Sequence, residues 1–430
     1  MPLSLDGDSG MVEKYIVRCN CVSTTLPIRI SDMNNGITVV QIEFLLLVAA
    51  TVAITARRLR LPYSAGLVLA GFGLAFLPFG LQTPLTKDLI FSVFLPPLIF
   101  EASLYIRWRE LRRDLPLLLV LVTVGMMVSA ALTATGMHFL IGWEWPGAVL
   151  FGALIAATDP VSVIATFKET GVHGRLRMLA EAESIFNDGT AAVAFSVALA
   201  IITGGPWDSF TIAQTLLTSV SGGLFCGALV AGGILLMAGR TEDHLVEIAL
   251  TTIAAYGSFL LAEHFRLSGV LATMTAGIII GNIGSPRALS AKGREAVESF
   301  WEYVAFVVNS LIFILIGMHE AKQNFQGALL PIVAGIAVVM AGRAAAIYPC
   351  CALLGRFFVP VRMSHRHVLF WGGLRGALAL ALSLGLPPEI PHRNEIVTVA
   401  FAVVAFSIFV QGATMAPLLR RLGELPAPHD

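Results

Sequence analysis

The sequence predicts an all-α polytopic membrane protein, with about thirteen transmembrane helices arranged as two inverted six-helix repeats. Three observations predict this class. The 430 residues are 56% hydrophobic and only 13% charged, which is too apolar for a soluble globular protein of this length. Apolar runs of about 20 residues, the length that crosses a bilayer, follow one another along the chain. Two of these runs, seven crossings apart, are interrupted by proline or glycine motifs.

Composition also excludes several kinds of partner. The formal net charge is +0 and the chain has no long run of Lys and Arg, so we expect no nucleic-acid partner. Three of the five cysteines lie in apolar runs, and Cys19 with Cys21 forms only a C-x-C in a polar segment. This pattern indicates neither a disulfide framework nor a zinc site, and we expect no cofactor.

In chain order, residues 1–36 form a polar leader that we expect to be irregular, with Met33 as an alternative start of the protein. Residues 37–420 form the membrane domain, and 421–430 form a short tail. The predicted spans are 38–56, 61–80, 88–106, 115–137, 145–168, 180–203, 212–238, 244–263, 268–284, 300–319, 327–355, 365–386 and 394–419.

The basic residues predict the orientation of these spans. Alternate loops, beginning with the one at residues 57–60, carry most of the Lys and Arg. The opposite loops hold only Lys87, Arg266, Lys322 and Arg393. Because cytoplasmic loops carry the excess of basic residues, we expect a cell-membrane protein with a cytoplasmic C-terminus and an N-terminus outside.

The fifth span is interrupted at Thr158-Asp159-Pro160 and the twelfth at Gly372 to Gly376. An odd number of crossings separates them, so the two halves have opposite orientations in the membrane. Paired interrupted spans of this kind mark the binding site of a transporter. Spans one to six and eight to thirteen are then the repeats, and span seven connects them. Gly223 and Gly227 in span seven predict close helix packing.

Three carboxylates lie near mid-membrane: Asp159 in the fifth span, and Glu183 and Asp188 in the sixth. An ionisable side chain at this depth costs about 2.5 to 3.5 kcal/mol and rarely persists without a task or a partner. Pro160 breaks its helix, so we expect backbone oxygens near Ala156 to Thr158 to lose their partners and become available to a cation. Asp159 would be stabilised by the N–H groups of the half-helix that follows. A proline kink with a capping Asp is the alternative.

The sixth span advances about 100° per residue, which places Ser184 and Asp188 on one stripe and Glu183 and Asn187 on the next. A carboxylate and a hydroxyl at one place suit a small hard cation. Arg343 and Arg375 lie inside spans and need buried counter-charges, because guanidinium does not deprotonate. We expect Glu183 to pair with Arg375. The alternative is that these acids and arginines form structural salt bridges and nothing passes through.

Glu101 follows Pro96-Pro97, which we expect to break the third span and to direct this carboxylate toward the interior. There it would be a further ion ligand. The other interpretation, which stays open, is that its side chain extends to the membrane interface.

Four motifs match a known family in order and spacing over nearly the whole chain. They are Ala157-Thr158-Asp159-Pro160, Glu183 to Gly189, Phe94 to Glu101, and Gly372 to Gly376. Together they resemble the monovalent cation/proton antiporters of the NhaP and NHE branch. The resemblance implies a homodimer, with interface helices at about 38–106 and 212–319 and moving core helices at about 115–203 and 327–419.

The resemblance also implies the roles of individual residues. Asp188 would be the ion and proton site, helped by Thr158, Ser184, Asp159 and Glu101. Asn187 and Asp159 would bridge the two interrupted helices, and Glu183 would pair with Arg375. From the residues alone, Arg343 is a further charge-compensating candidate. An Asn-Asp pair in place of two aspartates resembles the electroneutral members.

We therefore predict a secondary transporter, not an enzyme, that exchanges Na⁺ for H⁺ by alternating access and serves pH homeostasis. Li⁺ and K⁺ are alternative cargoes. A cation channel is a second class of function, and an intramembrane aspartyl protease using Asp159 and Asp188 is a third. Titratable groups on inverted, interrupted helices favour alternating access over a channel filter. A protease pair would share one proton and would need no arginines.

Overall fold

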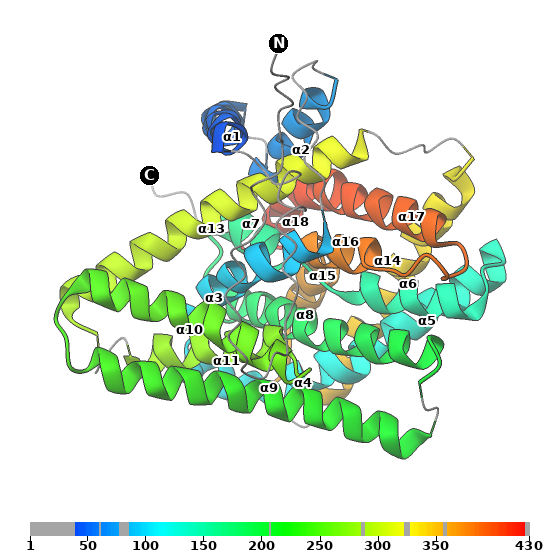
Figure 1. The fold of residues 1–430 in the computed structure, drawn as a ribbon. Helices are drawn as coiled ribbons and strands as arrows, with labels where there is room; N and C mark the ends of the chain where they lie inside the picture. The colour runs from blue at the N-terminus through cyan, green and yellow to red at the C-terminus, as the bar shows by residue number, and fades with distance from the viewer. Residues whose placement is uncertain are drawn as a thin grey trace, which may run out of the picture. The chain divides into compact units, whose positions relative to one another are not determined.

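The computed structural model describes residues 39–59, 62–76, 86–205, 208–284, 289–321, 327–355 and 359–425. The predicted leader and the alternative start at Met33 lie outside the described residues. Within the described ranges all regular structure is helical (Figure 1). The elements are α1 Val39–Leu59, α2 Tyr63–Leu74, η2 Leu89–Phe94, α3 Leu95–Leu104, α4 Trp108–Val120, η3 Leu121–Gly125, α5 Met126–Ile141, α6 Trp145–Ala156, α7 Pro160–Thr170, α8 Arg175–Ile202, α9 Ser209–Ala238, α10 His244–His264, α11 Gly269–Ile279, η4 Ile280–Gly284, α13 Ala291–Glu320, α14 Leu329–Leu354, α15 Met363–Trp371, α16 Ala377–Leu384, α17 Arg393–Phe406, η5 Ser407–Gly412 and α18 Ala413–Arg421.

Seven helices in the described part of the chain are long and apolar enough to cross a membrane. They are 108–141, 175–202, 210–238, 244–264, 291–320, 329–354 and 393–421. Shorter apolar helices, among them α2 and α6, account for several other predicted spans. These apolar helices confirm the prediction of an all-α polytopic membrane protein.

The helices pack in two sets. In one, α9, α10 and α11 pack against one another, α11 packs on α3, and α13 packs on α2 (Figure 1). In the other, α5 packs on α14 and α6, and α6 packs on α8. The close packing predicted from Gly223 and Gly227 is confirmed, because a Cβ at Gly227 would lie 2.2 Å from the Ala272 carbonyl oxygen of α11.

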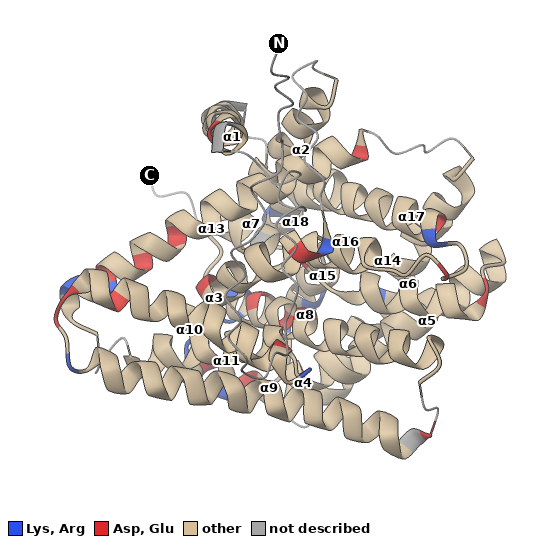
Figure 2. Ribbon diagram, viewed as in Figure 1, with Lys and Arg blue, Asp and Glu red and all other residues tan. Residues whose placement is uncertain are grey.

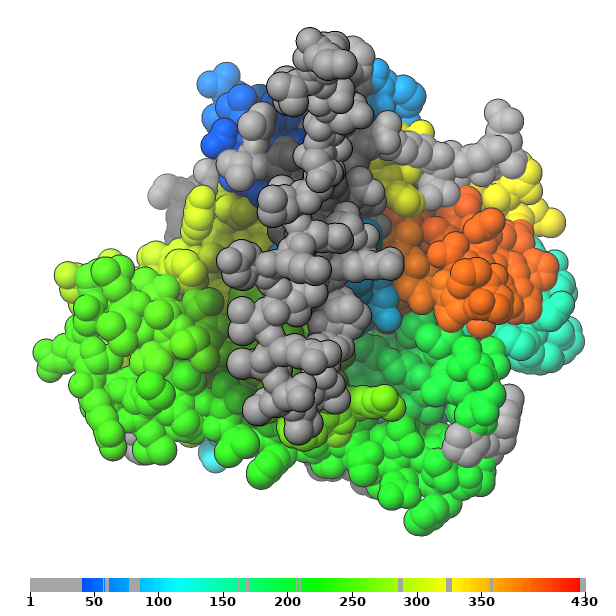
Figure 3. Space-filling model, viewed as in Figure 1, coloured from blue at the N-terminus to red at the C-terminus, as the bar shows by residue number. Residues whose placement is uncertain are grey.

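The outer surface of α9 is largely apolar. Phe210, Leu217, Phe225 and Leu236 are each at least 68% exposed, and the helix carries no charged residue (Figure 2). In the space-filling view α9 and α10, in green, form a broad part of the visible face (Figure 3). A water-facing helix would not present such side chains, so this surface suits lipid or another apolar partner.

The third predicted span is not broken at its prolines. Residues 89–104 form one continuous helix, in which the π-helical segment η2 leads directly into α3. Pro97 cannot donate to the carbonyl oxygen one turn back and its ring crowds that oxygen, so a wider turn accommodates it. The prediction of a break here is therefore wrong.

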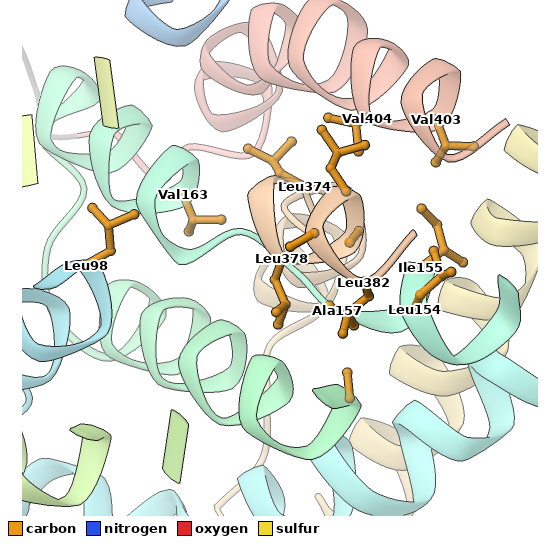
Figure 4. Packing of buried hydrophobic residues seen from close by; sticks show 14 of the residues in the cluster. Leu98, Leu154, Ile155, Ala157, Val163, Leu374, Leu378, Leu382, Val403 and Val404 are labelled. Carbon is orange, nitrogen blue, oxygen red and sulfur yellow. The ribbon is translucent and has the colours of Figure 1, made fainter. Parts of the chain in front are cut away.

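The fifth and twelfth spans are interrupted where the sequence predicts. Helix α6 ends at Ala156 and α7 begins at Pro160, whereas α15 ends at Trp371 and α16 begins at Ala377. Leu378 and Leu382 of α16 lie in one buried apolar cluster with Leu154 and Ala157 at the end of α6 (Figure 4). Buried apolar contacts thus hold the two breaks close together.

Candidate functional site

The two helix breaks meet at Asp159. Its backbone N–H donates to the Leu374 carbonyl oxygen at 2.7 Å, which joins one break directly to the other. The glycines of the second break make room for this approach. A Cβ at Gly376 would lie 2.5 Å from the Asp159 Cβ, and a Cβ at Gly373 would lie 2.5 Å from the Arg343 Nε.

We expect Gly376→Ala to lower the melting temperature of the purified protein in detergent, because the added methyl group displaces Asp159 from the crossing. Gly73→Ala is the matched control, since a Cβ there meets nothing within 4 Å and alanine favours a helix. Equal melting temperatures for the two variants would contradict the close approach at Gly376.

The carbonyl oxygens released by the break in the fifth span already have donors. The Arg375 Nη1 donates to the Ala156 and Ala157 oxygens at 2.7 and 3.0 Å, and the Asn187 Nδ2 donates to the Ala156 oxygen at 2.8 Å. A cation is favoured at this place because it is the negative end of α6. The expectation that these oxygens lose their partners is therefore wrong for Ala156 and Ala157, because Arg375 and Asn187 donate to them.

Glu183 pairs with Arg343, not with Arg375. The Arg343 Nη1 and Nη2 donate to the two Glu183 carboxylate oxygens at 2.7 and 2.9 Å, and Nη2 also donates to the Leu369 oxygen at 2.9 Å. Both side chains are buried. The predicted partner was wrong because the Arg375 guanidinium donates to the carbonyl oxygens at the end of α6. Helix α14 instead places Arg343 beside Glu183, where the two side chains form a bidentate ion pair.

A small cavity, with room for about one water molecule, lies beside the crossing. Its lining residues come from α3, the break before α7, α8 and α16: Leu95, Leu98, Ile99, Ala157, Thr158, Asp159, Pro160, Asp188, Gly376, Ala377, Leu378 and Ala379. Two carboxylates, Asp159 and Asp188, therefore face one otherwise largely apolar space.

Asp188 has an oxygen that no protein group satisfies. The side chain is only 3% exposed, and Oδ1 has no hydrogen-bond partner. The Thr158 backbone N–H donates to the same carboxylate. A buried carboxylate oxygen without a partner is costly unless it binds a proton or a cation. Asp188 is thus the side chain best placed to hold either one.

Asp159 differs from Asp188 in being held by its neighbours. It directly precedes α7, and Ser162 donates its hydroxyl hydrogen to the Asp159 Oδ2. An anion at the start of a helix is stabilised by the free N–H groups there. Sequence reasoning missed Ser162. The signal was a hydroxyl three residues after an Asp at a predicted helix start, a spacing typical of helix N-termini.

Thr158 is the centre of a small polar network. Its Oγ1 accepts hydrogen bonds from the Ser184 Oγ and from the Asn187 Nδ2, both at 3.1 Å. Asn187 thereby connects α8 to the end of α6, while the Asp159 backbone connects the first break to the second. Ser184 is buried behind Thr158 and does not line the cavity.

Glu101 is not brought to the cavity, although Leu95, Leu98 and Ile99 of the same helix line it. The residue is buried and lies on the side of α3 near Tyr105. Its carboxylate interacts electrostatically with the Tyr105 hydroxyl, as do those of Glu298 and Glu302 of α13. The expectation that it is an ion ligand gains no support from this position.

The chain matches known proteins along most of its length. The family "Sodium/hydrogen exchanger, transmembrane" matches residues 44–421. The Na⁺/H⁺ antiporter ApNhaP of Aphanothece halophytica is 39% identical over 85% of this chain and 70% of its own length. The Na⁺/H⁺ antiporter NhaH of Halobacillus dabanensis is 34% identical over 89% of this chain and 98% of its own.

The solved structure of the sodium proton antiporter MjNhaP1 from Methanocaldococcus jannaschii has a similar fold, with a TM-score of 0.71 at 20% identity, over 91% of this chain and 99% of that one. These relatives are transporters, as the sequence predicts, and not enzymes. The resemblance read from the four motifs is confirmed: the chain belongs to the transmembrane sodium/hydrogen exchanger family.

Proposed function

We propose that this protein exchanges Na⁺ for H⁺ across a membrane by alternating access, with both ions bound in turn at Asp188. The observation that carries the proposal is the buried, unpartnered Asp188 oxygen beside a cavity where two interrupted helices meet. The relatives named as Na⁺/H⁺ antiporters support Na⁺ as the cargo. The alternative of K⁺/H⁺ exchange has no such support.

Asp188 supplies the charged ligand, and Asp159 and Thr158 lie beside it in the same cavity. Oxygen ligands suit a hard alkali cation. The Thr158 hydroxyl oxygen has two lone pairs, and both accept hydrogen bonds from Ser184 and Asn187. Ligation of Na⁺ by this oxygen therefore requires Ser184 to turn its hydroxyl hydrogen away. In this proposal Ser184 donates to Thr158 when the site holds no Na⁺ and turns its hydroxyl away when Thr158 binds the ion.

The wider architecture follows the sequence interpretation. Helices at about 38–106 and 212–319 form the interface domain of a homodimer, and those at about 115–203 and 327–419 form the moving core. The two packing sets described above support this division. We further propose thirteen crossings in two inverted repeats, a cytoplasmic C-terminus and an N-terminus outside, on the distribution of basic residues.

The charges around Asp188 predict electroneutral exchange. Glu183 and Arg343 neutralise each other, Arg375 is held by backbone oxygens, and Asp159 is held by Ser162 and the start of α7. If only Asp188 changes its occupant, each cycle trades one positive charge for another. An imposed membrane potential should then leave the exchange rate unchanged.

Competition for one carboxylate predicts the pH dependence. Na⁺ needs the ionised form of Asp188, so its apparent affinity should weaken toward acid pH while the maximal rate changes little. Initial rates in liposomes, measured over a range of Na⁺ concentrations at several pH values, check this. A pH effect that persists at saturating Na⁺ on both sides would show that a second titrating group, such as Asp159, takes part in the cycle.

A further inference from the structure

Two buried polar side chains of the last predicted span contact the end of α15 and the break that follows it. Ser407 and Gln411 are 0% and 2% exposed, respectively. The Ser407 Oγ accepts from the Arg375 backbone N–H at 2.9 Å and donates to the Gln411 Oε1 at 2.7 Å. The Gln411 Nε2 donates to the carbonyl oxygen of Trp371, the last residue of α15, at 3.1 Å. A chain of hydrogen bonds thus runs from the end of α15 to Arg375 inside the break.

The local backbone explains why these two residues can do this. Ser407 and Gln411 both belong to the π-helical segment η5, between α17 and α18. Residues four apart lie on neighbouring turns of one face, so both side chains point at the same break. π-Helical turns of this kind are frequently found at functional sites.

The pair is connected to the proposed ion site through Arg375. The Arg375 side chain donates to the Ala156 and Ala157 oxygens, immediately before Thr158 and Asp159. Leu374, adjacent to Arg375, accepts from the Asp159 backbone N–H. Ser407 and Gln411 do not line the cavity that contains Asp188. Any influence on the cation must therefore pass through the residues of the break.

We propose that Ser407 and Gln411 are positioning residues that fix Arg375 and thereby set the affinity of the site for its cation. The proposal rests on the proposed Na⁺/H⁺ exchange. With the pair intact, Arg375 holds the end of α6, so that Thr158 and Asp159 stay beside Asp188. Without it, the Arg375 backbone N–H loses its acceptor and the second break loosens.

The test compares three variants in proteoliposomes. Ser407→Ala removes the hydroxyl, whereas Ser407→Thr keeps it. Ser383→Ala is the matched control, because Ser383 is equally buried in the neighbouring α16 but donates only within its own helix, to the Leu380 oxygen at 2.8 Å. The readouts are the Na⁺ concentration at half-maximal rate and the maximal rate, together with the thermal stabilisation that Na⁺ confers in detergent.

For Ser407→Ala we expect the half-maximal Na⁺ concentration to rise about fivefold to tenfold, the size of effect that one buried hydrogen bond has on an equilibrium. The maximal rate should change much less. At a fixed, low Na⁺ concentration the activity of Ser407→Ala should shift toward alkaline pH, because fewer protons are needed to displace a weakly held cation. Ser407→Thr should restore the wild-type affinity, and Ser383→Ala should keep it.

Equal effects of Ser407→Ala and Ser383→Ala, or a loss of maximal rate without a change in Na⁺ affinity, would overturn the positioning role. Gln411→Met breaks the same series of hydrogen bonds at its other end. If Ser407→Ala does not fold, the same measurements are made on Gln411→Met. If neither variant folds while Ser383→Ala does, the pair is structural and the proposal is rejected. An inactive wild-type protein would instead contradict the proposed exchange itself.

Discussion

Asp188→Asn is expected to abolish Na⁺-driven proton flux while leaving a folded, membrane-inserted protein. The amide keeps the size of the side chain but removes the group that binds Na⁺ or a proton. Folding should survive because Oδ1 makes no hydrogen bond within the protein, and the amide oxygen of Asn can still accept from the Thr158 backbone N–H. Flux is measured in liposomes with a pH-sensitive dye, and folding by size-exclusion profile and melting temperature.

The matched control for Asp188→Asn is Asp114→Asn. Asp114 is a buried carboxylate of α4 that pairs with Arg175 at 2.6 Å and does not line the cavity. We expect this substitution to lower stability, yet the protein that does fold should retain Na⁺-dependent flux. Near-normal flux from Asp188→Asn would remove Asp188 from the transport site.

Glu183 and Arg343 are expected to give the largest effect on stability. Removal of one partner leaves a buried charge uncompensated, which costs about 3 to 5 kcal/mol, whereas removal of both can be much milder. We therefore expect Glu183→Gln and Arg343→Gln each to melt well below the wild type, and the double variant to melt nearer to it.

The exposed pair Arg107 and Glu110, whose side chains are 81% and 46% exposed, serves as the control. Arg107→Gln should change the melting temperature only slightly, because exposed ion pairs are worth about 1 kcal/mol or less. A double variant whose loss equals the sum of the two single losses would show that Glu183 and Arg343 do not stabilise each other.

Local chemistry explains why the two helix breaks could be predicted. Pro160 lacks an N–H and crowds the preceding turn, and the glycines from Gly372 to Gly376 let the backbone approach its neighbours closely. These features depend on a few adjacent residues, so the sequence carries them directly.

Partners across the fold could not be predicted in the same way. Arg343 and Arg375 looked equivalent as buried cations, and only the position of α14 and of the end of α6 decides which one meets Glu183. The direction of the Glu101 side chain could not be predicted because it depends on η2. A π-helical turn changes the rotation about the helix axis of every residue that follows it. Ser407 and Gln411 were visible only as polar residues in an apolar run, and their acceptors lie far away in the sequence.

Ion-coupled proton flux in liposomes that contain the purified wild-type protein tests coupled exchange at Asp188 most directly. An outward Na⁺ gradient should drive proton uptake, K⁺ should do so weakly or not at all, and an imposed membrane potential should not change the rate. Cation movement without proton counterflow, as in a channel, or a rate set by the membrane potential, would contradict electroneutral exchange at this single carboxylate.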